Sequence, residues 1–246
     1  MHYIVFDLEF NQDFTSFSEV LRKRSQYPFE IIQIGAVKLD SDFNYIGKFN
    51  RYIKSTMYSN ISQFITDLTG ITNEKLEDEE TFTKVYKSFI NFINDDTIFC
   101  TWGLSDVKEL YKNAIYHSLN TNLLPRSYIN IQPYLSKYLG FSSKKLIRLQ
   151  SAVELLNIDM KHKFHDALND AYYTAEIFKK IYSPLIHAKI YDPHFVKPRP
   201  QKRKETVDYE ALINQFNKMY NGKITEKEQE MIKLAYNMGR TRQFIK

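Results

Sequence analysis

Short apolar stretches in the first part of the chain predict three β-strands. Tyr3–Phe6 is an unbroken run of aromatic and β-branched residues, which is typical of a strand buried on both faces. Ile31–Leu39 and Tyr45–Ile53 predict two further strands, and the polar segment Asp40–Asn44 between them is a suitable hairpin turn. The chain therefore begins with strands of a sheet, two of which are antiparallel neighbours.

Beyond residue 60 the pattern changes, because segments with helical spacing alternate with short strands. Thr81–Asn94 shows this most clearly, since its apolar residues recur every three or four positions. The alternation predicts an α/β fold with a mixed five-stranded sheet flanked by helices. Further helices are expected at Ile61–Leu68, Asp106–Tyr116 with Ser105 as its N-cap, Leu146–Leu156 and Asp166–Tyr182, and further strands at Thr97–Thr101 and Tyr128–Ile131.

A basic, proline-containing stretch, Lys197–Lys204, predicts a linker near the end of this domain. We therefore expect a domain over residues 1–190, a linker over 191–205 and a small helical extension over 206–246. Two helices are expected in the extension, Asp208–Tyr220 and a second that starts at Thr225 with Glu228 completing a capping box. The apolar residues expected to pack between them are Leu212, Phe216 and Met219 with Ile232, Ala235 and Met238. Such a pair is too small to be stable alone.

Composition and charge narrow the function classes. The single cysteine, Cys100, excludes an internal disulfide and a cysteine-rich zinc site, and it fits a reducing cytoplasm. The sequence has no recognisable secretory signal and no apolar run long enough to span a bilayer, so no membrane association is expected. Residues 197–246 hold 12 Lys/Arg and 6 Asp/Glu, whereas the rest is close to neutral. This segment either grips nucleic-acid phosphates or contacts a protein, or it is a solvated linker.

Acidic residues follow two of the predicted strands. Asp7 and Glu9 are two positions apart at the end of the first strand, so both side chains point to one face. The pair either holds a cation or is a solvated strand end. Asp106 opens the helix after Thr97–Thr101, where it suits the helix dipole and also lies at the strand end that binds ligands in α/β sheets.

A histidine and a third acidic position lie at the start of the last long helix. Asp170 is a poor helix former on a face that is expected to be buried, which calls for a functional reason. His165, five residues earlier, is a candidate base, because histidine titrates near neutral pH. Asp166 lies between them, and we expect it to stabilise the first turn of the helix.

Taken in order, these residues resemble the DEDDh branch of the DEDD superfamily of 3′→5′ exonucleases. Asp7-Leu8-Glu9 is similar to the first exonuclease motif, and Asp106 in Thr-Trp-Gly-Leu-Ser-Asp is similar to the second. His165-x-Ala167-x-x-Asp170-Ala171 is similar to the third, and the tyrosine branch would carry Tyr where this chain has Asp166. The likeness covers roughly residues 1–185 and looks closest to the Eri1-like and KapD-like subgroup, which includes RNA-trimming enzymes.

The resemblance implies an RNase H-like fold, an enzyme and a mechanism. Asp7, Glu9 and Asp170 would hold one Mg²⁺ or Mn²⁺ ion, Asp7 would bridge to a second ion near Asp106, and His165 would deprotonate the attacking water. The substrates would be single-stranded RNA or DNA 3′ ends, with RNA weakly favoured, and the product a nucleoside 5′-monophosphate. Residues expected to contact the terminal nucleotide are Phe10, Asn11, Ile71 and Trp102, although many members have Thr where this chain has Asn11 and the two aromatic rings could instead belong to the core.

Two other hypotheses for the function remain. The chain could be a catalytically silent regulator that keeps the fold and binds nucleic acid or protein, although all five motif residues are present. It could also be a haloacid-dehalogenase-like phosphatase, but that chemistry needs Asp-x-Asp after the first strand, where this chain has Asp7-Leu8-Glu9.

Overall fold

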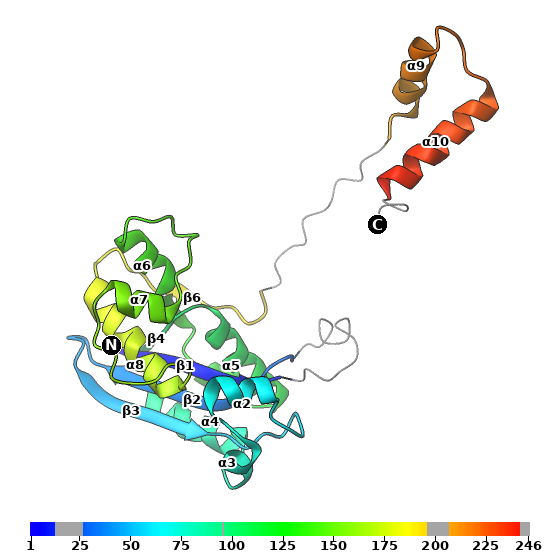
Figure 1. Cartoon of the computed structure of the whole chain (residues 1–246). Coiled ribbons are helices and arrows are strands. Elements are labelled where there is room, and N and C mark those ends of the chain that lie inside the picture. The colour runs from blue at the N-terminus through cyan, green and yellow to red at the C-terminus, as the bar shows by residue number, and fades with distance from the viewer. Residues whose placement is uncertain (13–26, 95, 196–206, 242–246) are drawn as a thin grey trace. The chain divides into compact units, whose positions relative to one another are not determined.

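The computed structural model of the chain describes residues 1–12, 27–94, 96–195 and 207–241 (Figure 1). Two compact units make up the chain, Met1–Phe195 and Val196–Lys246. The strands of the first unit are β1 (His2–Asn11), β2 (Glu30–Leu39), β3 (Tyr45–Tyr52), β4 (Thr97–Thr101), β5 (Ser127–Asn130) and β6 (Lys189–Ile190). Its described helices are α2 (Gln63–Thr69), α3 (Asn73–Glu77), α4 (Phe82–Ile93), α5 (Ser105–Tyr116), the 3₁₀ turn η1 (Thr121–Leu123), α6 (Gln132–Tyr138), α7 (Leu149–Leu155) and α8 (Ala167–Ile181).

The six strands form one mixed sheet in the order β3-β2-β1-β4-β5-β6. β1, β4 and β5 run parallel, whereas β2 and β3 form the antiparallel hairpin and β6 pairs antiparallel with β5. The α/β fold with a mixed sheet is confirmed. The sheet has one more strand than the five predicted. The additional strand, β6, contains only two residues, which is too short to show the alternation of apolar and polar residues that predicts a strand.

Alternating residues of β1 divide the core between the two faces of the sheet. Ile4, Phe6 and Leu8 pack on one face with residues of α4 and α5. Tyr3 and Val5 pack on the opposite face with residues of α6, α7 and α8, and Figure 1 shows α8 lying across the strands on that side. Asp7 and Glu9 continue the odd-numbered series, so the end of β1 directs two carboxylates toward α8.

Most predicted helices are present, with corrections at their ends. Ser105 is not the N-cap of α5: Leu104 takes that position in a helical conformation, and no side chain caps this end. Asp166 is the N-cap of α8, since its carboxylate accepts a hydrogen bond from the Asn169 amide at 3.1 Å, as expected. The sequence did not predict α3 or α6. Helix α3 has only five residues, and α6 begins beside Pro133, a residue that usually interrupts a helix.

The C-terminal unit contains α9 (Tyr209–Met219) and α10 (Glu226–Arg240). Thr225 caps α10 in the predicted capping box with Glu228. The expected packing between the helices is wrong in part: of the described residues in this unit only Ile213 is buried, and Met219 is 68% exposed. Two short helices can bury only the side chains between them, so most of the apolar residues of α9 and α10 keep exposed surface. The basic stretch Lys197–Lys204 lies outside the described residues.

No helix in the described ranges has the length and apolar character needed to cross a membrane.

Candidate active site

Three carboxylates from two distant parts of the sequence meet at one edge of the sheet. Asp7 and Glu9 lie on β1, and Asp170 lies in the first turn of α8. One carboxylate oxygen from each lies within 4.8 Å of the others. Glu9 and Asp170 are each 8% exposed, whereas Asp7 keeps more surface. Because three like charges are costly at this spacing, the group needs either protons or a cation.

The start of α8 reaches this position because β2 has a glycine opposite Asp7. Gly35 pairs with Asp7 across the β1–β2 ladder. A Cβ at residue 35 would lie 2.0 Å from the Leu168 nitrogen and 2.1 Å from the Ala167 carbonyl carbon. The absence of a side chain therefore lets the helix backbone rest directly on the strand.

Gln33, two residues before Gly35 on the same strand, clamps the helix start with its side chain. The Gln33 amide donates to Asp166 Oδ2 at 3.0 Å, and its carbonyl accepts from the Ala167 amide at 3.3 Å. The Tyr52 hydroxyl also donates to Asp166 Oδ2, at 3.3 Å. Gln33 is 1% exposed, so these bonds are shielded from water. No local sequence pattern marks Gln33 or Gly35 as site residues, because their role depends on a contact with a helix more than 130 positions away.

His165 lies just before α8, beside Asp170. Its backbone amide donates to Asp170 Oδ2 at 3.2 Å. His165 has a φ of 62°, in the left-handed region where histidine is tolerated better than most residues, and it is exposed. Asp170 Oδ1 is buried without a partner among the described residues. One oxygen of Asp170 is thus fixed, and the other is left for a ligand.

Asp106 comes to the same edge from the next strand. β4 is the parallel neighbour of β1, and the turn Trp102–Leu104 leads from it into α5. Within this turn the Thr101 hydroxyl donates to the Gly103 carbonyl. Asp106 is 8% exposed and lies close enough to Asp7 to raise its pKa.

Burial and mutual repulsion raise the pKa of all four carboxyls. Burial is the largest cause in each case. The pKa of Asp7 lies well above its usual value because of burial and then the charge of Asp106. The pKa of Glu9 is raised to about 8, with Asp170 as the main neighbouring charge. Asp106 and Asp170 each have a pKa of about 7. A divalent cation would stabilise the charged forms. The carboxylate oxygens are the donors that Mg²⁺ or Mn²⁺ prefers, and they include Asp170 Oδ1, which no described residue bonds.

The four expected substrate contacts do not form one surface. Asn11 is fully buried, and its amide donates to the Asn60 carbonyl at 3.1 Å, so it ties β1 to the loop before α2. Ile71 is 1% exposed in a cluster with Ile32 and other apolar residues. Neither side chain offers surface to a nucleotide in this structure, because both are enclosed by the packing of the 60–76 region.

Phe10 and Trp102 are partly buried, and each belongs to one of the core clusters. The Phe10 ring lies 5.6 Å from the Phe29 ring, on the side of the α4–α5 core. Trp102 packs on the opposite side, and its indole nitrogen has no partner among the described residues. Their exposed parts remain available to a ligand, so they stay candidate contacts.

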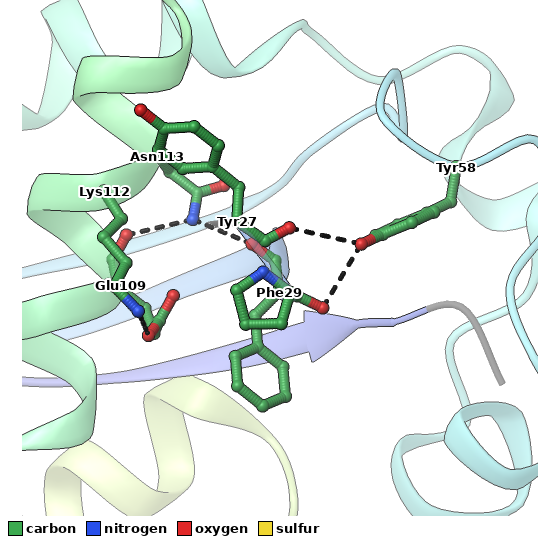
Figure 2. A network of polar contacts seen from close by, with 7 residues as sticks. Tyr27, Phe29, Tyr58, Glu109, Lys112 and Asn113 are labelled. Carbon is green, nitrogen blue, oxygen red and sulfur yellow. Dashed lines mark hydrogen bonds and ion pairs between the residues drawn. The ribbon is translucent and has the colours of Figure 1, made fainter. Parts of the chain in front are cut away.

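A polar network fixes the segment that enters β2 (Figure 2). The Asn113 side chain on α5 donates to the Phe29 carbonyl at 3.0 Å and accepts from the Ile31 amide at 3.1 Å. The Tyr58 hydroxyl lies 3.3 Å from the carbonyl oxygens of Tyr27 and Pro28. The start of β2, and with it Gln33 and Gly35, is thereby held against α5.

Glu109 in this network is a buried acid that was not among the residues expected at the site. It is 6% exposed, and its Oε1 lies 2.6 Å from Lys112 Nζ. Its charge contributes to the raised pKa of Asp106, one helical turn away. The only sequence signal was an Asp-x-x-Glu spacing on a helix face, which is common on solvated helices.

Comparisons with known proteins identify the family of this site. Residues 4–178 match the family model of the RNase T-type exonucleases. A PolC-type DNA polymerase III from Clostridium perfringens is 29% identical over 210 residues, which cover 85% of this chain and 13% of the polymerase. The 3′-5′ exonuclease crn-4 of Caenorhabditis elegans is 24% identical over 72% of this chain and 63% of its own length. This chain thus spans about an eighth of the polymerase and under two thirds of crn-4.

The fold agrees with this match. The nuclease domain of 3′hExo, a DEDDh family member bound to rAMP, superposes with a TM-score of 0.64 at 20% identity. The alignment covers 78% of this chain and 96% of that domain. In the first unit of this chain Asp7 and Glu9 lie at the end of β1, Asp106 lies in the first turn of α5, and His165 precedes α8. The chain belongs to the RNase T-type exonuclease family and has the fold of the DEDDh 3′-exonucleases.

Proposed function

We propose that the chain is a metal-dependent 3′→5′ exonuclease that releases nucleoside 5′-monophosphates from single-stranded nucleic acid. The observation that carries this proposal is the meeting of Asp7, Glu9 and Asp170 within 4.8 Å, beside Asp106 and an exposed His165. Family membership supports nuclease chemistry at this edge of the sheet. A silent regulator would not need four carboxyls with raised pKa values at one place.

The carboxylates fit divalent ions. Asp7, Glu9 and Asp170 would hold one Mg²⁺ or Mn²⁺ ion, and Asp106 with Asp7 would take part in holding a second. A pair of bound divalent ions supplies charge stabilisation to a phosphodiester and makes a water molecule more acidic. Gln33 and Gly35 act indirectly, since they hold the helix that carries Asp170.

His165 would be the general base. Its position before α8 leaves the side chain exposed while its backbone is bonded to Asp170. It takes the proton of the attacking water as the new oxygen–phosphorus bond forms. The bond between phosphorus and the 3′-oxygen of the preceding nucleotide breaks, and that oxygen takes a proton from solvent. The terminal nucleotide then leaves as a 5′-monophosphate.

The substrate would be a single-stranded 3′ end, with RNA weakly favoured over DNA. The likeness to the subgroup with RNA-trimming enzymes and the fold shared with the rAMP-bound 3′hExo domain support RNA. The match to PolC-type polymerases supports DNA. Discrimination depends on contacts to the 2′-hydroxyl. We further propose a cytoplasmic setting for the protein, in keeping with its lone buried Cys100.

A gel time course with 5′-labelled single-stranded RNA and DNA of one sequence tests the proposal. With Mg²⁺ or Mn²⁺ we expect a ladder that shortens from the 3′ end, faster on RNA, and none in EDTA. Binding without any shortening of either strand would contradict the enzyme and favour the silent regulator. Faster DNA shortening would leave the enzyme and reverse the sugar preference.

A further inference from the structure

A pocket lies at the same end of the sheet as the carboxylates but at a different strand. It has a volume of about 280 Å³ and is formed by β5, β6, α6 and the turn before α5. Two lysines and a histidine line it, together with two tyrosines, and none of its described lining residues is acidic. The lining residues that matter here are Lys137, Lys189, His187, Tyr128, Tyr134 and Leu104.

The fold holds these side chains in place through two connections. Tyr128 on β5 pairs with Lys189 on β6 in the antiparallel ladder. The Tyr134 hydroxyl on α6 donates to the His187 carbonyl at 3.2 Å and lies 3.3 Å from the His187 amide, from which it accepts. The segment 187–190 is therefore tied to the sheet through Lys189 and to α6 through the backbone of His187, and both basic residues lie beside the tyrosines.

The pocket lies at the same edge of the sheet as the carboxylates, with Tyr128 on the α4–α5 face and Asp7 on the face that packs against α8. Because β1, β4 and β5 are parallel, their carboxyl ends share one edge of the sheet. In the sheet, Val5 of β1 pairs with Cys100 of β4, and the next residue of β4, Thr101, pairs with Asn130 of β5. The pocket residue Asn130 is therefore level with Phe6, the residue just before Asp7. Adjacent strands are about 4.8 Å apart, which places the end of β5 roughly 10 Å from β1. Leu104, two residues before Asp106, lines the pocket and joins the two sites.

The chemistry of the lining selects a ligand with both a negative charge and a flat ring. Two ammonium groups suit a phosphate, and in the described part of the chain neither lysine forms an ion pair with an acid. Tyrosine rings stack on bases regardless of sequence. A strand whose 3′ end lies at the carboxylates and which follows the sheet edge would bring an upstream nucleotide here.

We propose that this pocket is a second binding site for the substrate strand, which holds an upstream phosphate between Lys137 and Lys189 and a base against Tyr134 or Tyr128. The inference rests on the proposed exonuclease function, since it takes the ligand to be the same strand. It adds a binding site for upstream nucleotides of the strand, separate from the site that cleaves its 3′ end.

The test is equilibrium binding of the full chain to fluorescein-labelled 12-nucleotide single strands, RNA and DNA, in EDTA, where cleavage cannot occur. The double variant K137Q/K189Q removes the two pocket charges. The matched control K48Q/K87Q removes two exposed lysine charges from β3 and α4, away from the pocket. Thermal unfolding of both variants should match that of the unmodified protein.

We expect the Kd of K137Q/K189Q to rise about tenfold, and the slope of log Kd against log salt to fall by about 0.7, as for the loss of one neutralised phosphate on a single strand. The control should bind like the unmodified protein. Equal losses in both double variants would show a general charge effect, and unchanged binding in K137Q/K189Q would show that the pocket does not hold the strand. Either result overturns the proposal. The gel time course tests the exonuclease separately, because it needs metal and this binding assay does not.

Discussion

Gly35 lies directly opposite Asp7 in the β1–β2 pairing, and the backbone of Ala167 and Leu168 occupies the space that a side chain at residue 35 would need. The distance between the first and third acidic motifs is set by this contact. Because residue 35 has no side chain, strand β2 and helix α8 can pack closely, and this packing brings Asp170 next to Asp7.

Gly35→Ala should move the start of α8 and impair both stability and cleavage. The added Cβ meets backbone atoms at 2.0–2.5 Å, which cannot rotate away. We expect a loss of at least roughly 1–3 kcal/mol in the free energy of unfolding, as for overpacked sites. Urea unfolding and the gel assay measure the two effects. Gly47→Ala, where the nearest atom is on the Phe92 ring at 3.1 Å, is the milder control; equal effects of both changes would contradict the assigned contact.

Much of this arrangement follows from local sequence signals, and the part that does not depends on long-range contacts. Strand alternation predicts that Asp7 and Glu9 share one face of the sheet, and the structure confirms this. The capping box predicted for Thr225 and Glu228 is also present. The role of Gln33 was hidden, because a polar residue in an apolar strand does not reveal which helix it will bond. Burial of Asn11 likewise depends on the loop around Asn60, which no local pattern describes.

Divalent metal should stabilise the protein more at pH 8 than at pH 6. The raised pKa values mean that, between about pH 4 and pH 8, the folded metal-free protein binds more protons than the unfolded chain. The stability that Glu9, Asp106 and Asp170 contribute therefore falls as pH rises through this window, and their contribution is lost above it. Metal binds the deprotonated carboxylates, so its effect on Tm should grow with pH.

Asp170→Asn is the control for this metal effect. The change keeps the shape of the side chain and removes one of the repelling charges, so metal-free Tm at pH 8 should stay the same or rise. The increase in Tm with Mg²⁺ or Mn²⁺ should largely disappear. An equal metal response in Asp170→Asn would show that the ions bind elsewhere.

His165→Ala should lower turnover by about 10²–10⁴-fold, the usual contribution of a general base, while the metal-induced rise in Tm persists. Single-turnover rates and thermal unfolding separate the two effects. Asp166→Ala is the neighbouring comparison: it removes the N-cap of α8 and should cost about 0.5–2 kcal/mol of stability with a smaller loss of activity. An inactive Asp166→Ala beside an active His165→Ala would reverse the assignment.

Removal of residues 197–246 should weaken binding to single strands and flatten its salt dependence. This segment carries 12 Lys/Arg against 6 Asp/Glu, and the preceding residues form a compact unit of their own. Anisotropy titrations at several salt concentrations compare the full chain with residues 1–196. Identical affinity and slope would favour a role as a linker and a protein-binding extension.

The most direct test of the central claim is the release of nucleotides by the unmodified protein and by Asp7→Asn, from a single strand labelled at its 3′-terminal nucleotide. Chromatography of the products at pH 8, with Mg²⁺ or with EDTA, identifies what is released. We expect a labelled nucleoside 5′-monophosphate from the unmodified protein with Mg²⁺, and no release in EDTA or by Asp7→Asn. Comparable release by Asp7→Asn, or in EDTA, would contradict a metal-dependent exonuclease site at the end of β1.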